Sequence, residues 1–119
     1  MPNEPKCHAT QTITFGENNC YTISGDTDVK KSGKNKHCWF QIEGSGFTGD
    51  ITIQWDNRKN NGWPEDKTLQ QDQKTRRWPT QGPKHATYTY SLIDSNGNTL
   101  KECTDGGLGG ELPSMTVDP

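Results

Sequence analysis

Polar and apolar residues alternate along several stretches of the chain, with the period of two that is typical of half-buried β-strands. The clearest stretch is residues 86–93, and three large side chains fall on one of its faces: Tyr88, Tyr90 and Leu92. The Asn-Gly pair at residues 96–97 follows and favours a type I′ hairpin, because both turn residues need a positive φ. A turn at that position pairs Tyr90 with Cys103 and carries Cys103 toward the interior.

Two further strand pairs are predicted upstream. Residues 10–15 and 20–24 form a first hairpin, and residues 38–42 and 50–55 form a second across a glycine-containing loop. Each strand of the second pair has one apolar face, made by Cys38, Phe40 and Ile42 on one strand and by Ile51, Ile53 and Trp55 on the other. The pattern therefore predicts an all-β fold: a small antiparallel β-sandwich or β-barrel of about six or more strands.

The alternation stops between residues 57 and 84, and this stretch is predicted as one long irregular loop. Loops of this length in compact domains are usually functional or disordered, so we expect a contact surface here. Residues 1–6 are expected to be a flexible polar leader, and residues 105–119 a flexible Gly-rich tail. A single β-rich domain is expected between them, over residues 7–104.

The composition of the chain predicts that disulfide bonds stabilise this fold. Only 26% of the 119 residues are hydrophobic, which is a small supply of core for a folded domain. The chain also holds four cysteines: Cys7, Cys20, Cys38 and Cys103. Disulfides would restrict the unfolded chain and offset the small core, and they persist in oxidising compartments. We therefore expect a secreted, extracellular domain whose export signal has been removed, with Met1 an added start residue.

The order of the cysteines leaves three pairings open. A nested pairing of Cys7 with Cys103 and Cys20 with Cys38 is preferred, because it ties the first strand to the last. Its long outer loop would contribute roughly 4 to 5 kcal/mol in the chain-entropy model. The next choice joins Cys7 to Cys38 and Cys20 to Cys103.

Metal binding is the alternative role for these sulfur atoms. A zinc site would use the neighbouring pairs Cys7-His8 and His37-Cys38. Adjacent ligands and the absence of a Cys-x-x-Cys motif make poor tetrahedral geometry, so no metal and no other cofactor is expected.

Charge excludes some classes of partner. The chain has 13 basic and 15 acidic residues and a formal net charge of −2, which gives no overall attraction to nucleic acid or to an anionic membrane. No apolar run approaches the roughly 20 residues that a spanning helix needs, so membrane insertion is not expected. Local basic clusters remain at residues 30–36, at residues 58–59 and at residues 74–77. With acidic residues interspersed along the chain, we interpret them as solvated surface.

Tryptophan supplies the main candidates for binding, since four are many for so polar a chain. Alternation places Trp55 in the core and Trp39 on the opposite face of its strand. Trp63 and Trp78 fall in the long loop, where exposed indoles would stack on a sugar ring or anchor a protein partner. The alternative is that they fold back into a small core for that loop. The candidate binding residues are Trp63, Trp78, Arg58, Arg76 and Arg77.

A catalytic role is a second possibility. The chain resembles the small fungal guanyl-specific ribonucleases in size, in acidity, in an early cysteine that could join a late one, and in Glu-Cys-Thr at residues 102–104. The resemblance implies Glu43, Arg58 and His85 as catalytic residues, with His37 as a helper. Arg58 lies outside any predicted strand, and the pattern gives no amphipathic helix, so a role without catalysis is favoured.

Taken whole, the chain is similar to the small secreted cysteine-containing proteins that plant-associated ascomycete fungi, Trichoderma among them, release as effectors or elicitors. The similarity is one of type: size, an even number of cysteines, β-rich patterning and a polar surface. It implies a non-enzymatic protein that meets a plant or cell-wall target, protein or glycan, in the apoplast or at the cell surface. A ribonuclease-like hydrolase or its inactive relative, a carbohydrate-binding module, and a homodimer formed through a strand edge stay open.

Overall fold

The computed structural model describes residues 6–58, 62–82, 84–103 and 112–119. Within these ranges the chain forms nine strands and a single 3-10 turn at Glu17–Asn19. The strands are β1 His8–Phe15, β2 Tyr21–Gly25, β3 Asp28–Lys30, β4 Trp39–Ser45, β5 Ile51–Trp55, β6 Lys67–Leu69, β7 Thr75–Pro79, β8 Ala86–Ile93 and β9 Ser114–Asp118. No helix of the described residues is long and apolar enough to cross a membrane.

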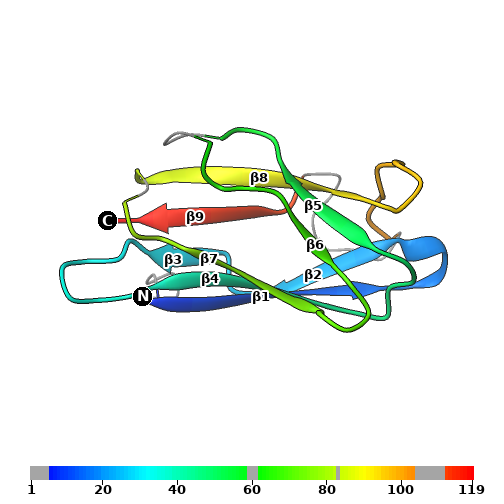
Figure 1. The fold of residues 1–119 in the computed structure, drawn as a ribbon, viewed down its shortest axis with the longest axis horizontal. Coiled ribbons are helices and arrows are strands. Elements are labelled where there is room, and N and C mark those ends of the chain that lie inside the picture. The colour runs from blue at the N-terminus through cyan, green and yellow to red at the C-terminus, as the bar shows by residue number, and fades with distance from the viewer. Residues whose placement is uncertain (1–5, 59–61, 83, 104–111) are drawn as a thin grey trace.

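The strands form two facing sheets (Figure 1). One has the order β2-β1-β4-β7 and the other the order β3-β9-β8-β5-β6. At the margins β6 lies against β7 and β1 against β3, so the sandwich is partly closed into a half-barrel. The predicted all-β sandwich is confirmed. Both sheets are mixed, however, because β1 runs parallel to β4 and β3 runs parallel to β9.

The first predicted hairpin is confirmed. Strands β1 and β2 are antiparallel, with Phe15 opposite Tyr21 and Ile13 opposite Ile23. The 3-10 turn between them contains Asn18 and Asn19 at φ of 59° and 57°. Asparagine tolerates this left-handed region better than most residues, which explains how the sequence makes so tight a reversal.

The second predicted pair is wrong. Strand β4 pairs with β1 and β7, whereas β5 pairs with β8 and β6 in the other sheet. The connection crosses from one sheet to the other through Gly46 and Gly49, at φ of 80° and 71°. Alternation identified the buried face of each strand correctly, but it carries no information about which strand lies alongside.

The expected long loop at residues 57–84 is also wrong in part. It contains β6 and β7, each at an edge of its sheet. These strands are short, and each turns only one large apolar side chain inward, Leu69 from β6 and Trp78 from β7. The neighbouring Arg76 and Arg77 hid the alternation of β7, because they place two charges next to its one buried position.

The expected flexible tail is wrong for its last residues. Strand β9 lies between β3 and β8 inside the second sheet, and Met115 and Val117 are fully buried. Residues 104–111 lie outside the described residues, as do residues 1–5 of the expected leader. Of that leader, Lys6 forms a parallel bridge with Val29.

The face predicted for β8 is confirmed, because Tyr88, Tyr90 and Leu92 are buried. The predicted turn register is wrong. The Asp94 carboxylate accepts hydrogen bonds from the backbone N–H groups of Asn96 and Asn98, each at 2.9 Å, and opens the two-residue turn into a wider loop. Ile93 therefore bridges Thr99. Cys103 does not pair with Tyr90, because its N–H donates to the Tyr21 carbonyl while the Tyr90 N–H donates to the Pro113 carbonyl.

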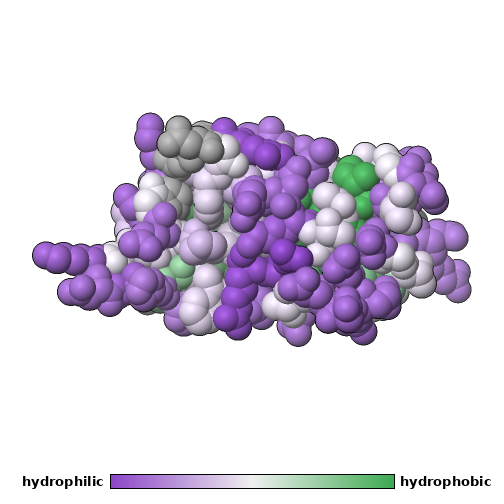
Figure 2. Space-filling model, in the orientation of Figure 1, coloured by the Kyte–Doolittle hydropathy of each residue, from purple (hydrophilic) through white to green (hydrophobic). Residues whose placement is uncertain are grey.

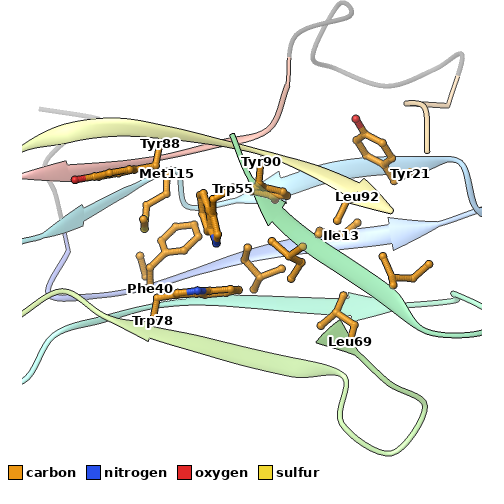
Figure 3. Packing of buried hydrophobic residues seen from close by; sticks show 14 of the residues in the cluster. Ile13, Tyr21, Phe40, Trp55, Leu69, Trp78, Tyr88, Tyr90, Leu92 and Met115 are labelled. Carbon is orange, nitrogen blue, oxygen red and sulfur yellow. The ribbon is translucent and has the colours of Figure 1, made fainter. Parts of the chain in front are cut away.

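Aromatic rings dominate the core between the sheets (Figure 3). Trp55 is buried as predicted, and it meets Trp78 and Tyr90 edge-to-face with ring centroids 5.4 and 5.0 Å apart. Trp78 comes from one sheet and Trp55 and Tyr90 from the other. Edge-to-face contacts of this kind join the two layers and add to the stabilisation that buried area provides.

One polar group is built into this core. The Tyr90 hydroxyl donates to the side-chain oxygen of Gln11, and the Gln11 amide donates to the carbonyls of Asp26 and Ser114 at 3.2 and 3.1 Å. Burial raises the pKa of Tyr90 well above its ordinary value of 10.0. The buried amide thus links β1 and β8 to β9 and to the residues that precede β3.

The two disulfides are Cys7–Cys38 and Cys20–Cys103, so the preferred nested pairing is wrong and the second choice is correct. The reason is the parallel contact between β1 and β4. Cys7 and Cys38 each immediately precede their strand, and those strands start side by side with His8 opposite Trp39. At the other end the Cys103 N–H donates to the Tyr21 carbonyl, which brings Cys103 beside Cys20.

Candidate functional site

The residues predicted to bind a partner are largely engaged inside the molecule. Trp78 is fully buried, and its indole N–H donates to the Glu65 carbonyl at 2.7 Å. The Lys67 ammonium lies 5.3 Å from the ring centroid. The expected exposure of Trp78 is therefore wrong. The ring does not form a separate small core for its segment either, because it packs in the main core between the two sheets.

Trp63 is half-buried. Its ring packs edge-on against Tyr88 with centroids 5.1 Å apart, at the margin of the main core. The peptide bond between Trp63 and Pro64 is cis. Trp63 thus joins its segment to the second sheet.

Trp39 faces outward as predicted, but its ring is covered. The His8 ring stacks on it at 3.5 Å with an interplanar angle of 21°, and the Arg77 guanidinium lies 4.4 Å from its centroid. Strands β1 and β7 flank β4 on opposite sides, so His8 and Arg77 cover opposite faces of the indole. Arg77 is held in place by a 2.7 Å hydrogen bond to the Gln41 side chain. A sugar ring could not stack on Trp39 without displacing one of them.

The other two arginines of the predicted set are also paired. Arg58 forms an ion pair with Asp66 at 2.5 Å and donates to the Trp55 carbonyl at 3.4 Å. Arg76 donates to the Thr68 carbonyl at 3.2 Å and to the Gln73 side chain at 3.0 Å. Arg58 thus joins the residue before β6 to β5, and Arg76 joins β7 to β6.

The residues of the ribonuclease-like alternative are not brought together. Glu43 is exposed near the end of β4, and it lies about 13 Å along the strand from Trp39, at roughly 3.3 Å per residue. His37 precedes Trp39, so it is farther still from Glu43. His85 lies 3.3 Å from the Asp118 carboxylate, and Arg58 is paired elsewhere. Among the described residues, no hydrogen bond or ion pair joins any two of the four.

The pairs considered for zinc do meet in space, because Cys7 and Cys38 are bonded to each other. Their sulfur atoms are consumed by that bond. Over the described part of the chain, no group of three or more His, Cys, Asp or Glu side chains could hold a metal ion.

The largest set of exposed charges of one sign lies elsewhere, between β3 and β4. We call residues 30–37 the lysine loop. Its tip turns through a hydrogen bond from the Lys36 N–H to the Gly33 carbonyl at 3.1 Å, with Asn35 at a φ of 65°. Four lysines of this loop are exposed, and none of them forms an ion pair with a described residue: Lys30, Lys31, Lys34 and Lys36.

The base of the lysine loop is fixed by buried hydrogen bonds. The Ser32 hydroxyl accepts from the Cys38 N–H at 2.8 Å and lies 3.0 Å from the Thr80 hydroxyl. The Thr80 N–H donates to the Cys38 carbonyl at 3.0 Å, and its hydroxyl lies 3.1 Å from the Lys30 carbonyl. The Cys7–Cys38 disulfide fastens the same point to β1. Buried, satisfied networks of this kind rigidify their surroundings.

The lysine loop projects from one end of the long axis, at the left of Figure 1. In the same view, Figure 2 shows that projection as continuously hydrophilic. Asp118 stands opposite Lys30 in the strand register, but its carboxylate lies against His85. Lys6, at the same end, is neutralised by Asp26 at 2.8 Å, and this hydrogen bond lowers the pKa of Asp26. The charges of the loop itself are not compensated in this way.

Comparisons of the chain with family models, with curated proteins and with solved structures found no match.

The basic residues of 30–36 can be read from the sequence, but their pattern alone does not separate a binding surface from solvated surface. The distribution of acidic residues around them is the additional signal. Between Asp28 and Glu43 the sequence has four lysines and no acidic residue, whereas residues 58–77 contain both basic and acidic residues. Mixed signs allow charges to pair within the fold, and a run of one sign does not.

Proposed function

We propose that the protein is a secreted, non-enzymatic binding protein of the effector or elicitor type, which acts on a plant target in the apoplast or at the cell surface. The observation that carries the proposal is the lysine loop. Four exposed ammonium groups without an internal partner stand on a base fixed by a disulfide and by buried hydrogen bonds. A rigid base lowers the entropy lost on binding, so the arrangement suits contact with another molecule.

Two disulfides and no free cysteine among the described residues are compatible with an oxidising, extracellular location. Catalysis receives less support, because the four candidate side chains lie apart. Sugar binding through exposed tryptophan faces also receives less support, since Trp78 is buried and both faces of Trp39 are covered.

The proposal is tested with the oxidised protein and isolated plant cell walls. We expect the protein to sediment with the walls, and we expect leaf tissue treated with it to give a defence response such as an oxidative burst. A His85→Ala variant should behave as wild type in both assays. The proposal is refuted if the protein shows no association with the walls and leaf tissue gives no response. Cleavage of RNA that is lost in His85→Ala would replace it with a hydrolase.

A further inference from the structure

We propose that the lysine loop binds a linear acidic polysaccharide, one that carries carboxylate groups along its chain. This inference rests on the proposed function, because it names the class of molecule that the binding protein would contact. The four lysines lie within seven consecutive residues and all are exposed. Lysines this close repel one another, and a polyanion that bridges them removes the repulsion and releases its own counterions.

The position of the loop allows such a chain to reach all four ammonium groups. The molecule is elongated, with extents of 43 × 30 × 24 Å, and the loop forms one end of it. Lys34 and Lys36 lie at the tip, and Lys30 and Lys31 lie where the loop leaves β3. Repeated carboxylates on one polymer would engage these groups together, so weak single contacts add up to useful avidity.

The side chains of the loop favour this occupant over nucleic acid. The cations are all lysines, which act as point charges toward carboxylate and phosphate alike, so the charges by themselves do not separate the two kinds of polymer. Stacking does separate them. Single-stranded nucleic acids are also held by bases stacked on aromatic rings. The nearest indole, that of Trp39, is already covered by His8 and Arg77.

An anionic membrane fits less well. Proteins that lie in the bilayer interface bury apolar side chains beside their basic ones. Residues 30–37 are Lys, Lys, Ser, Gly, Lys, Asn, Lys and His, so the loop has no apolar side chain to insert.

The experiment measures the affinity of the oxidised protein for polygalacturonate over a series of salt concentrations. A Lys34→Gln/Lys36→Gln variant is compared with Lys74→Gln/Lys101→Gln, which removes the same charge from exposed lysines outside the loop. We expect the loop variant to lose about tenfold or more in affinity, the size expected for two lysines against an anionic surface. The control variant should stay close to wild type. The dependence of binding on salt should be shallower in the loop variant.

Equal losses in the two variants would overturn the inference, because binding would then follow net charge and not the loop. Binding to RNA or to vesicles of anionic lipid that exceeds binding to polygalacturonate would overturn it as well. The outcome is separable from the proposed function. If polygalacturonate fails to bind but the protein still sediments with cell walls, only the inference falls. If wall association and the response of leaf tissue are absent as well, the proposed function falls too.

Discussion

Two parts of the chain without a clear alternating pattern in the sequence, residues 57–84 and the lysine loop, differ in how their charges are paired. The longer segment carries both basic and acidic residues, and its arginines find partners such as Asp66, Gln73 and Gln41. It folds into β6 and β7 and completes the sandwich. The lysine loop carries one sign of charge, forms no ion pair with a described residue and projects from the end of the molecule.

This difference shows that a segment rich in residues suited to binding need not have them free to contact a partner. The longer segment holds Trp63, Trp78 and three arginines, which are the residue types enriched at binding hot spots. Most of these indole rings and guanidinium groups contact other groups of the same chain. The loop holds only lysines and small polar residues, yet its charges are left for a partner. What a surface can bind therefore depends on which groups the fold leaves unpaired.

The largest effect is expected at Trp78. Replacing Trp78 by Ala should cost about 3–5 kcal/mol of unfolding free energy, because a fully buried ring is lost and the Glu65 carbonyl loses its donor. Denaturant unfolding followed by circular dichroism measures the loss. Trp63→Ala serves as a control. It should lower the unfolding free energy by less, since Trp63 is only half-buried. An unchanged unfolding midpoint for Trp78→Ala, together with weaker partner binding, would return the segment to a contact role.

The base of the lysine loop is tested next by removing its disulfide. The bond spans 31 residues of sequence, and a Cys7→Ser/Cys38→Ser variant should lose roughly 3–4 kcal/mol in the chain-entropy model. We also expect faster hydrogen exchange at the backbone amides of residues 30–37. Cys20→Ser/Cys103→Ser is the matched control, because it removes a covalent link but leaves the loop base intact. Equal exchange of the loop amides in both variants would show that the disulfide does not hold the base.

A smaller effect is expected at Ser32. The Ser32→Ala substitution leaves the buried Cys38 N–H without its acceptor, which should cost about 1–3 kcal/mol. Ser45, at the exposed end of β4, gives the control, and Ser45→Ala should change stability by no more than about 0.5 kcal/mol. Thermal unfolding compares the two. A Ser32→Ala variant as stable as Ser45→Ala would mean that the hydrogen bonds of the base contribute nothing.

The smallest stability effect concerns the neutralised pair at the same end, Lys6 and Asp26. The hydrogen bond from Lys6 lowers the pKa of Asp26 below its ordinary value of 3.8. The contribution of the Asp26 carboxylate to the unfolding free energy is therefore fully present above pH 3.8, and it is lost as the pH falls through the folded-state pKa. Because Lys6 is largely exposed, we expect less than about 1 kcal/mol. Unfolding free energies between pH 6 and pH 2.5 should fall less steeply for Asp26→Asn than for wild type. If the unfolding free energies of the two proteins fall with the same slope, Asp26 does not contribute to the loss of stability in acid.

Local features of the fold could be predicted from the sequence. The hairpin of β1 and β2 followed from two alternating runs around an asparagine-rich turn, and the buried face of β8 followed from its aromatic period. Pairings between distant segments could not be predicted. The parallel contact of β1 with β4 joins residues about thirty positions apart, and it decided the disulfide pairing. Strand β9 shows only Met115 and Val117 as its alternating apolar positions, which is too short a pattern to separate from a tail.

The candidate site was predictable in part. Residues 30–36 were recognised as basic, and the absence of acidic residues between Asp28 and Glu43 was available in the sequence. The sequence could not show whether the other candidate binding residues are exposed and unpaired. Burial of Trp78, the covering of Trp39 and the partners of Arg58 all depend on which strands meet. Those contacts exist only once the sandwich is assembled.

The most direct test of the account is lysine footprinting of the oxidised wild-type protein, with a low dose of an acetylating reagent and mass spectrometry. Acetylation is compared in the presence and absence of polygalacturonate, with Lys74 and Lys101 as internal references. We expect the polymer to protect the lysines of residues 30–37 and to leave both references unchanged. Protection at Lys67 and Lys74, with the lysine loop reacting as before, would contradict the account and place the contact surface in residues 57–84.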